Sequence, residues 1–234
     1  MDANRIRIAS YNVRKARGLD QQRRPERTLQ VINSLGADVV VLQEADKRLG
    51  SRYPALPRPM VETETDFDLV EVCANGISIG WHGNAVLVRK GLIVRDIEKL
   101  GLPGFEPRGA LRMTLDVGAG LTVVATHLGL LRRDRRAQLA VLDDATSADA
   151  HVVIAGDFNE WSARKGFEPL AARFVTHSPG RSFHAARPMA ALDRFALSYG
   201  LELRDGGVEQ GTLARVASDH LPIWSDILVP EVTC

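Results

Sequence analysis

The sequence VVIAGDFN, residues 152–159, places polar side chains directly after a run of apolar ones. Such a continuous apolar run is typical of a short strand that is covered on both faces. The ends of such strands are where ligand-binding crevices form in open α/β sheets. This stretch therefore predicts a buried strand that ends in functional side chains, although a single aspartate at this place is more often a turn residue.

The same arrangement recurs at other places along the chain. Residues 6–11 alternate apolar and polar side chains, residues 39–42 are all apolar, and both stretches predict strands that end at polar residues. The polar residues at predicted strand ends are Asn12, Glu44, His127, Asp157, Asn159, Asp193, Asp219 and His220. The sequence therefore predicts a polar site built from several strand ends.

Helices are expected between these strands. Pro25 at a first turn, an apolar face and Gly36 as a stop predict a helix over residues 25–36, and residues 132–145 and 163–172 predict two more. Residues 46–80 are interpreted as loop, apart from a short strand at 69–73 and a turn at 75–76. Further strands are expected at residues 84–88, 111–117, 121–126, 191–197, 201–204 and 223–228. Because hairpins occur among crossover units, the sheets should be mixed.

Composition bounds the class of protein. The chain has 234 residues, of which 45% are hydrophobic and 25% charged, and its net charge is +1. These values are typical of a globular protein and exclude a disordered chain, a collagen-like fibre and a strongly basic nucleic-acid coat. One domain over residues 1–234 is expected at this length. Neither a signal peptide nor a membrane span is predicted, and Cys73 and Cys234 show no metal or redox spacing, which favours a cytoplasmic location.

The strand-end residues share one chemistry. They offer carboxylate and carboxamide oxygens with two histidines and no cysteine, and such hard oxygen ligands suit Mg²⁺ or Mn²⁺. A metal held in this way neutralises charge on the oxygens of a phosphate ester. The spacing of the histidines argues against a zinc hydrolase, which would carry them in a pattern such as His-Glu-x-x-His.

Seven short segments then occur in a fixed order. They are SYNVR (10–14), LQE (42–44), GNA (83–85), THL (126–128), GDFN (156–159), LDR (192–194) and SDHLP (218–222). Together they resemble the motif set of the endonuclease/exonuclease/phosphatase superfamily, which includes deoxyribonuclease I. The resemblance spans residues 6–228. It implies an α/β fold of four layers, an α/β/β/α sandwich in which two packed mixed β-sheets are flanked by helices, with the active site at one end of the sheets.

The resemblance also implies roles for single residues. The implied ligands of Mg²⁺ or Mn²⁺ are Asn12, Glu44 and Asp219, with Glu44 binding directly. The implied catalytic residues are His127, Asp157, Asn159, Asp193 and His220, and the implied substrate-binding residues are Asn84 and Arg108. Arg108 would bind phosphate through two hydrogen bonds, and its alternative is a solvated surface arginine.

Physical chemistry independently supports a functional pair of His220 and Asp193. An imidazole that donates one ring proton to a carboxylate has a fixed tautomer and a raised affinity for a second proton. His220 would then act either as a base or as a charged phosphate ligand. Asp157 is the competing candidate for the base.

These features predict a Mg²⁺- or Mn²⁺-dependent hydrolase that cleaves a phosphate ester by attack of water. The alternative is a nuclease acting on DNA or RNA, and a non-catalytic scaffold with the same fold is a third reading. Nucleic acid, a phospholipid headgroup and a small metabolite all remain open as substrates, and the sequence indicates no obligate protein partner. The low aromatic content of 6% does not indicate recognition of single strands by base stacking, since only Trp81 and Trp161 lie near motifs.

One basic cluster stands apart from the motifs. Arg132, Arg133, Arg135 and Arg136 fall on the predicted helix over residues 132–145. We expect them to form a solvated helix face, since exposed charge is the commonest role of such a run. The alternative is a basic patch beside the site.

Overall fold

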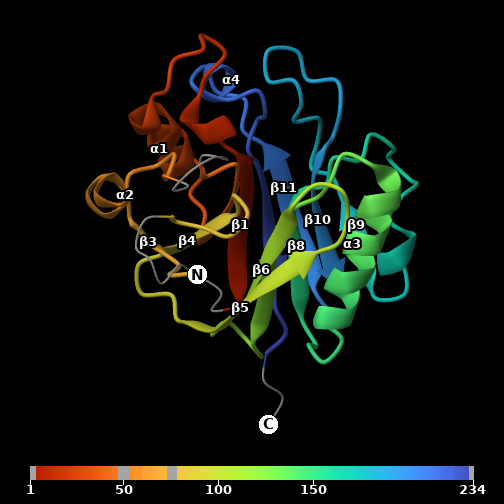
Figure 1. The fold of residues 1–234 in the computed structure, drawn as a ribbon. Helices are drawn as coiled ribbons and strands as arrows, with labels where there is room; N and C mark the ends of the chain where they lie inside the picture. The colour runs from red at the N-terminus through yellow and green to blue at the C-terminus, as the bar shows by residue number, and fades with distance from the viewer. Residues whose placement is uncertain (1–3, 47–52, 73–77, 232–234) are drawn as a thin grey trace.

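Two six-stranded sheets form the centre of the molecule in the computed structural model, which describes residues 4–46, 53–72 and 78–231 (Figure 1). The strands of the first sheet are β1 (Arg5–Asn12), β2 (Val39–Gln43), β3 (Phe67–Leu69), β4 (Ala85–Arg89), β11 (Glu202–Val208) and β12 (Ile223–Leu228). The strands of the second are β5 (Val94–Leu102), β6 (Arg108–Leu115), β7 (Leu121–His127), β8 (Val152–Asp157), β9 (Phe174–His177) and β10 (Asp193–Ser198).

Both sheets are mixed, as predicted. Their strand orders are β11-β12-β1-β2-β4-β3 and β5-β6-β7-β8-β10-β9. The pairs β1/β2 and β7/β8 are parallel, whereas their neighbours pair antiparallel. In both parallel pairs the strand that comes second along the chain is reached through a helix, which is the connection that parallel strands require.

Helices cover the outer face of each sheet. Helices α1 (Pro25–Ser34), α2 (Arg58–Glu64) and α4 (Ala214–Ala217) lie on the first sheet, and α3 (Arg132–Ala145) lies on the second (Figure 1). Three apolar clusters fill the spaces between these layers, one under each helical layer and one between the sheets. The predicted four-layer α/β/β/α sandwich is therefore confirmed.

Alternation along the strands assigns each side chain to one of these clusters. In β1, Ile6 and Ile8 face the second sheet, while Ala9 and Tyr11 face the helices. Helix α1 begins at Pro25 as predicted, and Gly36 follows its end with a φ of +58°, a conformation that glycine adopts without strain. Among the described residues, no helix is long and apolar enough to cross a membrane.

One predicted helix is wrong. Residues 163–172 contain only the single turn η2 (Glu168–Leu170). Gly166, with a φ of +98°, interrupts the stretch just before this turn. The helix formers on the two sides of Gly166 therefore do not join into one helix.

Other elements were missed or displaced. Helix α2 lies in the stretch 46–80 that was predicted to be loop. Pro57 is its N-cap and Pro59 lies in its first turn, where proline is tolerated, so these prolines do not exclude a helix. Edge strand β5 is mostly exposed on both faces and so lacks a clear apolar alternation. The strand predicted at 69–73 is replaced by β3, and the turn at 75–76 lies outside the described residues. The other predicted strands are confirmed with shifted ends.

Candidate active site

Three neighbouring strands of the second sheet bring polar side chains to one point. In β8, Asp157 continues the face of Val153 and Ala155, which points toward the first sheet. Asp157 pairs in register with His127 of β7 on one side and with Asp193 of β10 on the other. The sheet register therefore places these three side chains next to one another.

Asp157 is the centre of this group. It is buried, and its Oδ2 accepts a hydrogen bond of 3.1 Å from Asn12 Nδ2, which comes from the end of β1 in the other sheet. The same oxygen lies 3.4 Å from His127 Nε2 and 3.7 Å from His220 Nε2. One carboxylate thus joins both sheets and faces two imidazole rings.

Asn159 completes the turn after β8. Its backbone N–H donates to Asp157 Oδ1 at 2.9 Å, and its side-chain amide donates to the carbonyl of Leu128 at 2.9 Å. These bonds hold its backbone in a left-handed conformation, with a φ of +51°. Asn159 is therefore fixed beside Asp157 at the rim of the site.

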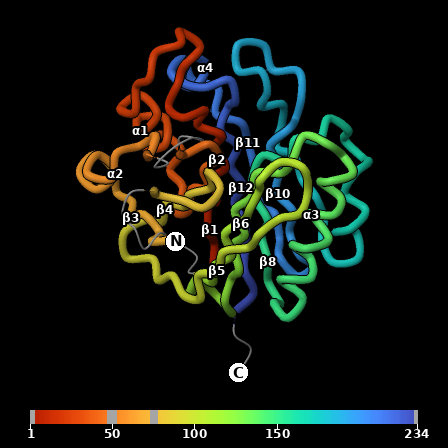
Figure 2. The backbone as a smooth tube through the Cα atoms, viewed as in Figure 1, coloured from red at the N-terminus to blue at the C-terminus, as the bar shows by residue number. Residues whose placement is uncertain are grey.

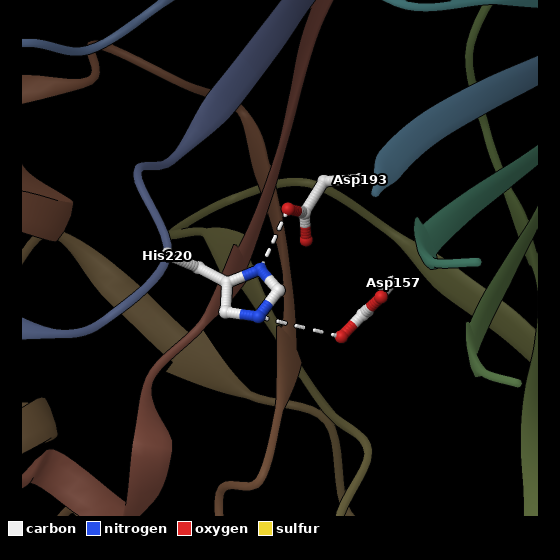
Figure 3. A group of neighbouring side chains, drawn as sticks. All are labelled: Asp157, Asp193 and His220. Carbon is white, nitrogen blue, oxygen red and sulfur yellow. Dashed lines mark hydrogen bonds and ion pairs between the residues drawn. The ribbon is translucent and has the colours of Figure 1, made fainter. Parts of the chain in front are cut away.

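His220 and Asp193 form a buried pair, as the sequence predicts. His220 Nδ1 lies 2.8 Å from Asp193 Oδ2 (Figure 3). The same oxygen accepts a hydrogen bond from the Ser182 hydroxyl. Burial alone would lower the pKa of His220, but the carboxylates of Asp193 and Asp157 outweigh it and raise that pKa to about 10. The two carboxylates therefore favour the protonated imidazole.

The same three side chains lie close enough together to share a metal ion. Asp157, Asp193 and His220 each offer one ligand atom, and these atoms all lie within 4.8 Å of one another (Figure 3). A metal, however, binds an imidazole nitrogen only after that nitrogen has lost its proton. The raised pKa of His220 and its hydrogen bond to Asp193 oppose this, so the group fits a hydrogen-bonded network better than a metal cage.

The two remaining acidic residues of the motifs lie closer to the surface. Glu44 directly follows β2, and its side chain is 29% exposed, while that of Asp219 is 24% exposed. The Lys15 ammonium contacts the Glu44 carboxylate, and Arg14 Nε lies 3.2 Å from Asp219 Oδ2. Each carboxylate is thus held by a cation from the segment that follows β1.

That segment has an unusual backbone. Arg14, Lys15 and Ala16 have φ values of +47°, +57° and +57°. Left-handed conformation costs each of these residues roughly 1–2 kcal/mol. Buried Ala16 anchors the turn, and the Lys15 N–H donates to the Glu44 carbonyl at 3.0 Å. The backbone is therefore strained where it brings two cations to the acidic residues, and no sequence pattern predicted a role for either cation.

All of these parts lie at one end of the two sheets. The segment after β1 and the segment before β10 stand at the end opposite to the C-terminus (Figure 2). The motifs with which the strands end therefore gather on one edge of the sandwich.

Comparison with known proteins agrees with this arrangement. The model of the Endonuclease/Exonuclease/phosphatase family matches residues 9–220. The chain belongs to the endonuclease/exonuclease/phosphatase family. Members of this family are hydrolases that act on phosphate esters. The resemblance predicted from the seven segments is confirmed.

The chain is also similar to a curated bacterial protein and to solved structures. It is 31% identical over 162 residues to the uncharacterized protein YbhP of Escherichia coli, and the match spans 63% of each chain. The endonuclease/exonuclease/phosphatase from Beutenbergia cavernae has 22% identity and a TM-score of 0.74, covering 97% of this chain and 72% of that one.

Two animal members of the fold are also similar. The human Nocturnin catalytic domain with bound sulfate has 19% identity and a TM-score of 0.70, covering 96% of this chain and 94% of that one. TDP2 of D. rerio complexed with a single-strand DNA product has 20% identity and a TM-score of 0.71, covering 95% and 98%. At these identities the likeness shows the fold.

Two family motif residues lie in structural contacts. Asn84 is buried, and its Nδ2 donates to the Gly109 carbonyl of the other sheet at 2.8 Å. Arg108 is also buried and pairs with Glu106 at 2.6 Å, so the alternative of a solvated arginine is wrong. These contacts connect the segment before β4 to β6 and Arg108 to the segment before it. The role of Asn84 and Arg108 in binding substrate stays a prediction.

The basic cluster on α3 is not one solvated face. Arg133 and Arg136 are exposed, but the Arg135 side chain is only 6% exposed. Arg135 and Arg132 lie 2.8 Å and 2.7 Å from the buried carboxylate of Glu160. Burial raises the pKa of Glu160, but these guanidinium groups outweigh it and lower that pKa to about 2. The prediction of a solvated face is therefore wrong for Arg135.

Proposed function

We propose that this family member is a Mg²⁺- or Mn²⁺-dependent hydrolase that cleaves a phosphate ester by attack of water on phosphorus. The observation that carries the proposal is the position of Asp157. Its buried carboxylate contacts Asn12 and faces His127 and protonated His220, and Asp193 holds His220 from behind. At such a site the carboxylate can accept a proton while the imidazolium stabilises an anion.

The charge on His220 separates the roles of the two candidates for the base. Because His220 is already protonated, its Nε2 donates a hydrogen bond to a phosphoryl oxygen, where negative charge grows during the reaction. The Asp157 carboxylate then receives the proton of the attacking water. Asp193 keeps the ring of His220 in place.

Asn12, Glu44 and Asp219 would hold the metal. Their donor atoms are all oxygens, which fits Mg²⁺ or Mn²⁺, and Glu44 and Asp219 reach partly exposed positions where each is balanced by a cation of the chain. When bound, the divalent cation neutralises charge on the phosphoryl and leaving oxygens. The Asn12 amide also contacts Asp157, so it connects the acidic residues to the catalytic group.

Lys15 should compete with the metal for Glu44. Replacing Lys15 with methionine, which keeps the length and removes the charge, should therefore tighten Mn²⁺ binding roughly two- to fivefold, since partly exposed ion pairs contribute about 0.2–1 kcal/mol. Calorimetric titration measures the dissociation constant, and Lys165→Met on an exposed loop is the matched control. Unchanged or weaker Mn²⁺ binding in Lys15→Met would contradict the competition.

The substrate class is tested by a panel of phosphate esters. Plasmid DNA, RNA, bis-p-nitrophenyl phosphate, sphingomyelin and inositol phosphates are each incubated with the protein in Mg²⁺, Mn²⁺ or EDTA. We expect hydrolysis of a small ester with either metal and none in EDTA. If the folded protein cleaves no member of the panel, the non-catalytic scaffold is the better account.

A nuclease is the second candidate. Arg133 and Arg136 are exposed on α3, and the similar D. rerio TDP2 holds a single-strand DNA product. The net charge of +1 nevertheless gives little long-range attraction for a polyanion. We therefore place the small ester first, and a rate on DNA or RNA at least about a hundredfold above that on the small ester would reverse the order.

A further inference from the structure

An exposed tryptophan stands beside the candidate active site. Trp161 follows Asn159 by two residues and is 64% exposed. Its ring lies 6.1 Å from that of Phe183 in an edge-to-face arrangement, and the Phe183 ring lies 4.9 Å from the His220 imidazole. Aromatic surface therefore extends from the His220 imidazole outward to solvent.

The position of Phe183 in this surface is set by the backbone. Phe183 and His220 form an isolated antiparallel bridge, and the Leu221 N–H donates to the Ser182 carbonyl at 2.8 Å. The Ser182 hydroxyl in turn binds Asp193, the partner of His220. Phe183 is thus attached to the same network that holds the catalytic imidazole.

Trp161 is also held firmly, although its side chain is exposed. Buried Arg194 donates to the carbonyls on both sides of it, to Glu160 at 3.3 Å and to Ser162 at 3.0 Å. The Glu160 carboxylate accepts the Ser162 N–H at 2.8 Å and is anchored by α3. The exposure of Trp161 is therefore a feature of a fixed backbone and does not come from a loosely held loop.

We propose that Trp161 and Phe183 form a binding site for a planar aromatic group that the substrate carries near its scissile phosphate. The base of a nucleotide and the ring of an aryl ester share this chemistry. Stacking on an aromatic side chain is worth about 1–3 kcal/mol per base, and a fixed ring loses little entropy when it binds. The inference rests on the proposed function, because His220 beside Phe183 would hold the phosphate.

Binding of two phosphates that differ only in the base tests this site. Adenosine 5′-monophosphate and ribose 5-phosphate are titrated into the protein in Mg²⁺ by calorimetry, and released phosphate is measured in parallel. Adenosine 5′-monophosphate should bind at least about fivefold more tightly, the lower end of what one stacked base contributes. Trp161→Ala should remove this preference, Trp161→Phe should keep most of it, and the affinity for ribose 5-phosphate should stay unchanged.

A spectroscopic signal and a matched control accompany the titration. Adenosine 5′-monophosphate should change the tryptophan fluorescence of the native protein, and Trp161→Phe should lose most of that change. Tyr199, which is 58% exposed just beyond the opposite end of β10, supplies the control variant Tyr199→Ala. That variant should bind both phosphates as the native protein does.

The outcomes separate this inference from the proposed function. Equal affinity for the two phosphates, including failure to bind either, overturns the aromatic site, as does a preference that survives in Trp161→Ala. Hydrolysis of bis-p-nitrophenyl phosphate is measured separately on the native protein. Metal-dependent hydrolysis without a base preference would keep the proposed function and reject the aromatic site, whereas a base preference without hydrolysis of any ester would do the reverse.

A nucleotide and an aryl ester are distinguished by a second pair of ligands. Phenyl phosphate is titrated beside adenosine 5′-monophosphate, since it carries its ring directly on the phosphate ester. Loss of affinity for both in Trp161→Ala assigns the site to aromatic groups in general. Loss for adenosine 5′-monophosphate alone assigns it to a base one sugar away from the phosphate.

Discussion

Glu44→Gln should abolish metal-dependent hydrolysis, with a loss of at least about a thousandfold in kcat/KM, while the protein remains folded. Glutamine keeps the volume of the side chain and removes the charge that would bind the metal, and a metal contributes several kcal/mol to stabilising the transition state. Because Glu44 is 29% exposed and lies outside the apolar clusters, its loss should change the free energy of unfolding little.

Two measurements check this expectation. Calorimetric titration with Mn²⁺ should show weak binding or none in Glu44→Gln, and thermal unfolding should show a native-like transition. Glu62, exposed on α2, supplies the control Glu62→Gln, which should bind Mn²⁺ as the native protein does. Native Mn²⁺ affinity in Glu44→Gln would remove this residue from the metal site.

His220→Ala should lower kcat by about 10³- to 10⁴-fold, because it removes both the proposed phosphate ligand and its charge. Asp193→Asn should lower kcat less, since the imidazole remains but loses the carboxylate that holds it. The double variant should be no worse than His220→Ala alone, because residues that act as a unit are not additive.

Rates on bis-p-nitrophenyl phosphate for the native protein and the three variants form the test. Thermal unfolding of each variant checks that the protein still folds. This control is needed because Asp193 is buried and its carboxylate also binds the Ser182 hydroxyl. A double variant whose loss equals the product of the two single losses would show that His220 and Asp193 act independently.

Local patterns along the chain were enough to predict which strands end in polar side chains. The continuous apolar run of β8 predicts a buried strand that ends at Asp157, and the apolar strand over residues 121–126 likewise ends next to His127. The period of a strand is a property of a few consecutive residues. The strands next to β8 and their register, which bring His127 and Asp193 beside Asp157, are not local properties, and their meeting was expected only from the family resemblance.

Other parts depend on contacts between distant residues and left no such pattern. Three consecutive left-handed residues at positions 14–16 carry no glycine, so the sequence has no signal for the turn that brings Lys15 to Glu44. Trp161 and Phe183 lie 22 positions apart in sequence and meet only because the segments after β8 and before β10 fold toward each other. The low aromatic content therefore argued against stacking, although the proposed site needs only two rings.

We propose that the site has two parts, an acidic part around Glu44 for the metal and a hydrogen-bonded part around His220 for the phosphate. Anomalous scattering from crystals soaked in Mn²⁺ locates the ion and so tests this division. We predict a peak within coordinating distance of the Glu44 carboxylate, with the bond between His220 and Asp193 intact. A peak bound by His220 and Asp193, in place of their hydrogen bond, would show that the division is wrong.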